Sequence, residues 1–295
     1  MKRTILAFAV LFFGIPAFLY AQQDTLEVTT RHVAGPVYMI EGGGAGNVGV
    51  IADPAGAVMI DTMYERFSNP IREELKALPG GDKISFVINT HWHGDHTDGN
   101  KAFGPGSVVV AHENVRALLA APQTLMGQTT QALPADALPS VTYSSVMKLY
   151  AGDIPIRLVH FRNAHSNGDT VVFIDKYKVV HMGDMFFNGM FPFMDVANGG
   201  SIENWVRHLD NILIELSPDT KIIPGHGPLA GVAELAAFRQ MLYDSAEIVR
   251  SQMKEGRTPD QIKSAGLPDS FEPWTKGFFT APQWLELVYQ SLAKQ

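Results

Sequence analysis

The sequence predicts one mixed α/β domain, with two mixed β-sheets and helices on their outer faces. Three observations predict this fold class. Strand-like runs followed by helices occur twice along the chain, histidine-rich turns follow several strands, and no Pro/Ser/Gly linker divides the chain. We therefore expect a single domain over residues 22–295 that ends in C-terminal helices.

The first half opens with strand-like runs rich in β-branched residues. Gly, Pro or Asp separates these runs, which cover residues 26–33, 37–41, 47–52 and 57–61. Apolar residues at helical spacing then predict a helix that starts near Ser68 and stops at Pro79. The rest of this half is predicted as a strand over 84–89, a strand over 107–111, a helix over 113–120 and a long loop over 122–140.

The second half repeats the pattern. Its strands are expected over 147–150, 154–161, 170–174, 178–182 and 221–223. Apolar residues spaced for amphipathic helices follow from Trp205 to Leu216 and from Leu235 to Val249. Thr280 and Gln283 have the spacing of a capping box and predict the start of a last helix.

The N-terminus has the layout of a signal peptide. Lys2 and Arg3 precede an apolar run from Ile5 to Tyr20, and Ala21 comes before polar residues. We expect removal of residues 1–21, which predicts a periplasmic or secreted protein with no membrane attachment after cleavage. The alternative is an uncleaved anchor, although the run is short for a membrane span.

Charge and composition narrow the function further. The chain has a formal net charge of -7, and no basic run of five residues exists, so a nucleic-acid partner is not expected. With 46% apolar residues the chain is able to bury a core. It has no cysteine, so disulfides and thiolate metal ligands are both excluded. A small-molecule substrate is the expected partner.

The segment from His91 to Asp95-His96 carries the strongest chemical signal. It contains three of the ten histidines of the chain and one aspartate within six residues, directly after a predicted strand. Imidazole and carboxylate are ligands for Zn²⁺, and alternate residues of a turn are able to point to different sides. The pattern therefore predicts a metal site in which His91 and His93 share one ion while Asp95 and His96 reach a second.

Thr90-His91-x-His93-x-Asp95-His96 resembles the signature of the metallo-β-lactamase superfamily. Further segments resemble that family's later motifs in order: Asn163-Ala164-His165-Ser166, Met182-Gly183-Asp184 and Pro224-Gly225-His226-Gly227. The resemblance spans about residues 37–227 and implies a four-layer αββα sandwich. By resemblance, His91, His93 and His165 would hold the first metal, Asp95, His96 and His226 the second, and Asp184 would bridge them.

The same resemblance implies the chemistry. Two divalent ions, with Zn²⁺ expected, would carry a bridging hydroxide that cleaves an ester, lactone or related carbonyl substrate. Asp95 would also pass a proton to the leaving group. Asp61, at the end of a predicted strand, would support the site from behind the ligands.

Other activities of the same fold stay open. Hydrolysis of β-lactams is the first alternative, although lactamases with a Cys ligand are excluded and those with only His and Asp ligands generally lack a carboxylate where Asp184 stands. The second is an iron-dependent oxidoreductase, and the third is a non-catalytic metal-binding or partner-binding protein. One-iron oxidoreductases do not need His96 and His226, and non-catalytic relatives lose ligands, whereas this chain has all seven.

The segment from Met185 to Met194 is rich in aromatic residues and methionine. Such a segment after a metal ligand fits either an apolar wall of a substrate pocket or core packing. We expect Phe191 and Phe193 to bind substrate, with the core as the alternative.

Overall fold

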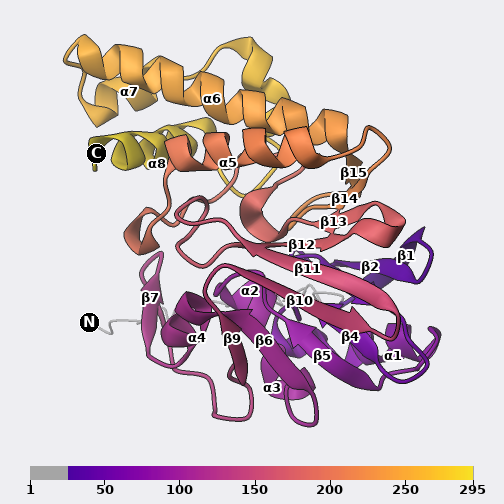
Figure 1. Cartoon of the computed structure of the whole chain (residues 1–295). Helices are drawn as coiled ribbons and strands as arrows, with labels where there is room; N and C mark the ends of the chain where they lie inside the picture. Colours follow the sequence, from indigo (N-terminus) through magenta and orange to yellow (C-terminus); the bar gives the residue numbers. More distant parts are fainter. Residues whose placement is uncertain (1–25, 295) are drawn as a thin grey trace, which may run out of the picture.

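Two β-sheets pack face to face in the computed structural model, which describes residues 26–294 (Figure 1). One buried cluster of aliphatic residues fills the space between them, drawing Val58 and Ile88 from the first sheet and Leu158 and Val172 from the second. Helices cover the two outer faces. This is the αββα sandwich that the sequence predicts, and the predicted fold class is confirmed.

The first sheet has seven strands. Their spatial order is β1 (Val28–Ala34), β2 (Val37–Gly42), β3 (Val48–Ile51), β4 (Ala57–Ile60), β5 (Ile84–Ile88), β6 (Val108–His112) and β9 (Val141–Tyr143). The first four strands pair antiparallel, and β4, β5, β6 and β9 run parallel. Every residue of β4 is buried because this central strand is covered on both faces.

The second sheet has six strands, in the order β10 (Val146–Ala151), β11 (Ile154–His160), β12 (Thr170–Ile174), β13 (Val179–His181), β14 (Lys221–Ile223) and β15 (Ala230–Gly231). All neighbours pair antiparallel except β13 and β14, which are parallel. The parallel pairs in both sheets matter for function, because parallel strands end at one edge of a sheet.

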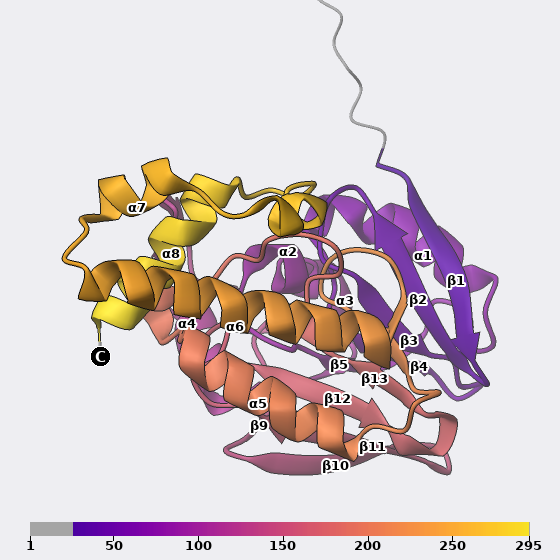
Figure 2. The same ribbon diagram turned by 90° about the horizontal axis from the view of Figure 1, so that it is seen from above.

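The outer helices are α1 (Ser68–Lys76), α2 (Gly94–Thr97), α3 (Asn100–Phe103) and α4 (Glu113–Leu119) on the first sheet, and α5 (Ile202–Glu215), α6 (Val232–Lys254), α7 (Pro259–Ala265) and α8 (Ala281–Ala293) on the second. Figure 2 looks down on α5 and α6, which lie side by side across the second sheet. Trp205, Phe238 and Trp284 from α5, α6 and α8 share one buried cluster. These helices therefore bury a second core on the outer face of that sheet.

The capping box predicted for the last helix is present. Gln283 Oε1 accepts a hydrogen bond from the backbone nitrogen of Thr280 at 2.9 Å, at the N-terminus of α8. This bond satisfies one of the free backbone donors that begin a helix.

The prediction of a long loop over residues 122–140 is partly wrong. Its first part forms a hairpin of β7 (Gln123–Leu125) and β8 (Gln128–Thr130), turned by Met126 and Gly127 in left-handed backbone conformations. The strands are three residues each and mostly exposed, so they carry no apolar alternation that would mark them in the sequence. The helix α7 was also not predicted.

The predicted signal peptide over 1–21 lies outside the described residues. Within residues 26–294, no helix combines the length and the apolar character that crossing a membrane requires.

Candidate metal centre

The seven predicted ligands lie together at one edge of the sandwich. His91 and His93 follow β5, and Asp95 and His96 lie on the single turn of α2. His165 lies in the loop between β11 and β12. The other two ligands, Asp184 and His226, follow the parallel strands β13 and β14. The ends of these strands meet at the same edge, which is how positions far apart in the sequence converge.

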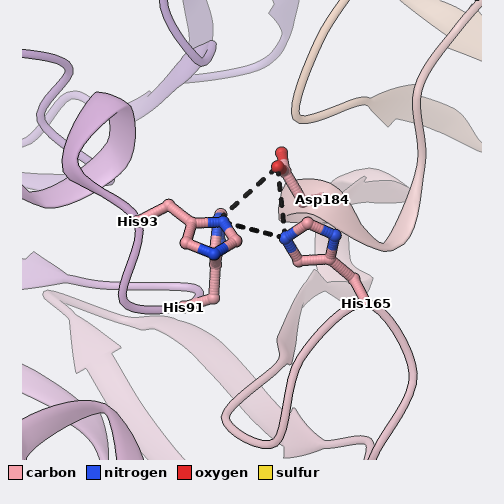
Figure 3. A group of neighbouring side chains, drawn as sticks. All are labelled: His91, His93, His165 and Asp184. Carbon is pink, nitrogen blue, oxygen red and sulfur yellow. Dashed lines mark hydrogen bonds and ion pairs between the residues drawn. The ribbon is translucent and has the colours of Figure 1, made fainter. Parts of the chain in front are cut away.

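His91, His93 and His165 form the first cluster, with Asp184 beside them (Figure 3). His93 Nδ1 lies 3.1 Å from His91 Nε2 and 3.0 Å from His165 Nε2. Three nitrogens bound to one tetrahedral Zn²⁺ at about 2.0 Å would lie about 3.3 Å apart. The spacing of the three rings is therefore close to that of ligands on one ion.

Asp95, His96 and His226 form the second cluster. His226 Nε2 lies 3.3 Å from His96 Nε2 and 3.2 Å from Asp95 Oδ2. The side chain of Asp95 is 22% exposed, whereas those of His96 and His226 are 0% and 7% exposed. Asp95 therefore presents the most accessible polar group of this cluster.

Asp184 lies between the two clusters. Its Oδ2 is 3.5 Å from His91 Nε2 and 3.4 Å from His165 Nε2, while its Oδ1 is 3.0 Å from His96 Nε2. Gly225 makes room for this carboxylate, because a Cβ at that position would stand 2.1 Å from Asp184 Oδ1. Each oxygen of Asp184 thus faces a different cluster.

Hydrogen bonds behind the ligands fix the orientation of the rings. Asp61, held at a positive φ of 62° after β4, accepts from His96 Nδ1 at 2.8 Å and from Thr90 Oγ1 at 2.7 Å. The Thr90 hydroxyl in turn accepts from His91 Nδ1 at 3.0 Å. Because these bonds occupy the Nδ1 atoms of His91 and His96, the Nε2 lone pairs face the metal centre.

Asp195 orients a ligand ring of the first cluster in the same way. The sequence analysis did not predict it. Its Oδ2 accepts from His93 Nε2 at 3.2 Å and from Trp92 Nε1 at 3.0 Å. Burial acts to raise the pKa of Asp195, but the interactions with His93 and the hydrogen bond from Asn198 together outweigh it and keep the pKa below its ordinary value. The sequence signal for Asp195 is weak: it precedes a Gly199-Gly200 pair but belongs to no metal-ligand spacing.

The electrostatics of the two clusters differ. Burial lowers the pKa of His165 to about 4 and that of His91 well below its ordinary value, so these two imidazoles of the first cluster are neutral at pH 7. Burial also acts to lower the pKa of His96. There, however, the carboxylates of Asp184, Asp95 and Asp61 outweigh it and hold the pKa well above the usual range. The second cluster therefore has an excess of negative charge that favours a bound cation.

The residues fit a pair of metal ions. Within residues 26–294, Asp184 Oδ1 is buried and receives no hydrogen bond of acceptable angle, although His96 Nε2 lies 3.0 Å away. A buried polar atom without a partner is costly. A cation between the carboxylate and the imidazole lone pair would satisfy both groups, so the donor set matches the divalent ions that the sequence predicts.

A cavity of about 340 Å³ opens onto the ligands. Its lining comprises Gly44, Tyr64, His93, Asp95, Leu125, Met126, Asp184, Phe187, Phe193, His226, Phe278, Phe279 and Gln283. Phe193 belongs to this lining, as expected of a residue that contacts substrate. The prediction for Phe191 is wrong: its ring is fully buried and stacks on Trp284 at 6.1 Å in the core beneath α8.

Comparison with known proteins agrees with this geometry. The family model for the metallo-beta-lactamase superfamily matches residues 42–226. The chain belongs to this superfamily. All seven candidate ligands of this superfamily member lie within the matched span, whereas α6, α7 and α8 lie beyond it.

Solved structures of other members share the fold at low sequence identity. DIM-1 metallo-beta-lactamase is 20% identical, with a TM-score of 0.59, and the match covers 74% of this chain and 98% of its own. The metallo-beta-lactamase from Pontibacter korlensis is 17% identical, also with a TM-score of 0.59, over 74% and 99% of the two chains. A search of curated proteins gave no match.

A third solved structure matches more of this chain. The stereoselective inverting sec-alkylsulfatase Pisa1 from Pseudomonas sp. is 15% identical, with a TM-score of 0.67, and the match covers 89% of this chain. This chain spans about half of the sulfatase, since the match covers 50% of that chain.

Proposed function

We propose that this protein is an exported dinuclear zinc hydrolase that cleaves an ester, lactone or related carbonyl compound. One observation carries the proposal: seven His and Asp side chains form two clusters, and the two oxygens of Asp184 face one cluster each. A metal-dependent hydrolase follows from the superfamily and the candidate site. The second ion, zinc, export and the substrate class are parts of the proposal.

Zn²⁺ is proposed because the donor set is imidazole and carboxylate at tetrahedral spacing. His91, His93 and His165 would hold one ion, Asp95, His96 and His226 the other, and Asp184 would bridge. When bound, two such ions lower the pKa of water and polarise a carbonyl oxygen.

The residues of the chain position these ions and manage protons. Asp61 and Asp195 fix the imidazole rings, so little reorganisation is needed when substrate binds. Asp95 lines the cavity and is the most exposed of its cluster, so its carboxylate is placed to receive a proton and return it to the leaving group.

Alkyl sulfates are a second candidate substrate class, after carbonyl compounds. The secondary alkylsulfatase matches more of this chain than the two lactamases do, 89% against 74%. We therefore include alkyl sulfates among the candidate substrates. β-Lactams and oxygen-dependent chemistry at iron are the remaining alternatives.

The test is hydrolysis by the purified mature protein with and without zinc. The panel comprises aryl esters, lactones, alkyl sulfates, phosphodiesters and β-lactams. We expect the highest kcat/KM for an ester or lactone, loss of activity in a chelator and recovery with Zn²⁺. A protein that cleaves β-lactams best, or that consumes oxygen when loaded with iron, would overturn the proposal.

Export has a separate test. N-terminal sequencing of the protein from its native host should place the mature end near Ala21, as the basic start and apolar run of the sequence indicate. A mature chain that still begins at Met1 would show that no signal peptide is removed.

A further inference from the structure

We propose that the part of the substrate that lies along the cavity walls, away from the scissile group, is apolar and uncharged, and that the cavity selects against a negative charge there. This inference rests on the proposed hydrolase function and adds the substrate class to it. Three features carry it: the walls of the cavity, the charges in its lining and the nature of the neighbouring surface.

The walls of the cavity are aromatic and aliphatic. Phe187 and Phe193 come from the segment after Asp184, and Phe278 and Phe279 come from the turn before α8. Phe193 and Phe279 stack with ring centroids 5.7 Å apart at an angle of 17°. A cavity of this size with stacked rings suits the acyl chain or ring of a small ligand.

Within residues 26–294, no Lys or Arg lines the cavity. Apart from the metal ligands, the polar side chains of the lining are Tyr64 and Gln283, both uncharged types. A carboxylate on the distal part of a substrate, away from the metal centre, would therefore lose its water without gaining a Lys or Arg partner from the lining, which is costly.

One groove beside the cavity carries carboxylates in its lining. A neighbouring groove shares Gly44, His226 and Phe278 with the cavity and is lined by Glu27 and Glu41. Glu41 is paired with Arg31, which is not part of the lining of either hollow. An anionic substituent that leaves the cavity toward this groove meets the carboxylate of Glu27 and the Glu41–Arg31 ion pair, and no Lys or Arg belongs to the groove lining to stabilise it.

A substitution at Met126 allows the proposed selectivity against anionic substrates to be reversed. It lies at the tip of the β7–β8 hairpin, lines the cavity and is 67% exposed. A longer cationic side chain there keeps its charge in water while reaching over the mouth of the cavity. The structure therefore allows a gain-of-function experiment that misfolding cannot imitate.

The first measurement compares three 4-nitrophenyl esters of equal chain length, namely hexanoate, the ester of adipic acid monoamide and the adipic acid monoester. They differ only in an apolar, a neutral polar or an anionic end. We expect kcat/KM of the zinc-loaded protein to fall in that order, with the anionic ester at least about 100-fold below hexanoate. Equal rates for hexanoate and the anionic ester would overturn the inference and leave the hydrolase intact.

The second measurement uses Met126→Lys, with Met126→Gln as the matched control of similar length without charge. The lysine variant should raise kcat/KM for the anionic ester at least about 10-fold, and the glutamine variant should not, because only the former supplies a counter-charge. An equal change in both variants would contradict the electrostatic explanation.

Binding separates this inference from the proposed function. Calorimetry on the zinc-loaded protein compares hexananilide with adipic acid monoanilide, whose amide bonds resist cleavage. Hexananilide should bind at least about 10-fold more tightly. If it does so and no ester is cleaved, the ester-hydrolase proposal fails and the cavity inference stands. If it shows no preference, or does not bind, the cavity inference is overturned.

Discussion

Asp184 is the residue on which the two clusters depend. It is buried at the base of the cavity, and four imidazoles lie around it. Burial acts to raise its pKa, but the interactions with the surrounding imidazoles, led by that with His96, together outweigh that effect and hold the pKa well below its ordinary value. The carboxylate is therefore ionised at neutral pH and is able to compensate two cations at once.

Replacing Asp184 by Asn tests that role. The substitution keeps the size of the side chain and removes its charge, so the two ions repel each other with less compensation. We expect Asp184→Asn to stay folded, to hold its second metal more weakly and to lose at least about 10²-fold in hydrolytic rate. Asp61→Asn, which alters only a support of His96 and Thr90, should lose about 10- to 100-fold. Two metals and full activity in Asp184→Asn would contradict the bridge.

Asp195 shows what residue-level sequence reasoning missed. The spacing of three His and one Asp within six residues predicts a metal site, whereas a single aspartate such as Asp195, beyond an aromatic segment, predicts no site. Only the fold brings its carboxylate to 3.2 Å from His93 Nε2. Supporting residues of this kind contact ligands across the fold, so their partners cannot be read from the chain.

We predict that Asp195→Asn weakens the first metal site about 10- to 100-fold, because His93 loses its carboxylate partner. Competition with a chromophoric chelator measures the affinity without reference to activity. Asp153→Asn is the matched control, since that carboxylate is 84% exposed and, among residues 26–294, forms an ion pair with Lys176 alone. Equal metal affinities in the two variants would show that Asp195 does not support the site.

At the level of elements, strands were easier to predict than the short segments that shape the pocket. Strands such as β5 and the fully buried β12 appear in the sequence as apolar runs, and the metal motifs follow strand ends. The β7–β8 hairpin and the turn carrying Phe278 and Phe279 have no such period, yet both line the cavity. Their positions depend on packing between distant elements, which local patterns do not encode.

Of the two phenylalanines predicted to bind substrate, Phe191 lies in the core and Phe193 lines the cavity. Phe191→Ala should lower the free energy of unfolding by about 3–5 kcal/mol, because it empties space beside Trp284 and Phe271. Phe193→Ala should instead raise KM for apolar substrates with a smaller change in stability, because its ring faces the cavity. Thermal melts run beside kinetics distinguish them. A reversed pattern would contradict the placement of both rings.

At the level of the whole molecule, the half-buried histidine His160 makes stability depend on pH. Burial, and secondarily the charge of His112, lowers the pKa of His160 to about 4 from an ordinary 6.5. The two rings stack 3.6 Å apart, where the first sheet faces the second. Between pH 6.5 and 4 the unfolded chain therefore binds a proton at this position that the folded chain does not.

Stability from His160 is thus fully present above pH 6.5 and is lost as pH falls toward 4. We expect the drop in unfolding free energy between pH 7.5 and 5 to be smaller in His160→Gln than in the natural protein. The difference should be about 1 kcal/mol once partial exposure of the ring is allowed for. Urea unfolding at both pH values measures it, and the metal ligands contribute equally to the two proteins. Identical drops would show that His160 does not titrate as described.

The superfamily fold and the two clusters together lead to one central claim, that this chain holds two divalent ions joined by Asp184. Elemental analysis of the purified protein, saturated with Zn²⁺ and freed of loosely bound metal, tests it most directly. We predict about two zinc ions per chain, because the seven ligands supply two sets of donors around one shared carboxylate. Saturation at one ion per chain, or isolation with a single tightly bound iron, would contradict it.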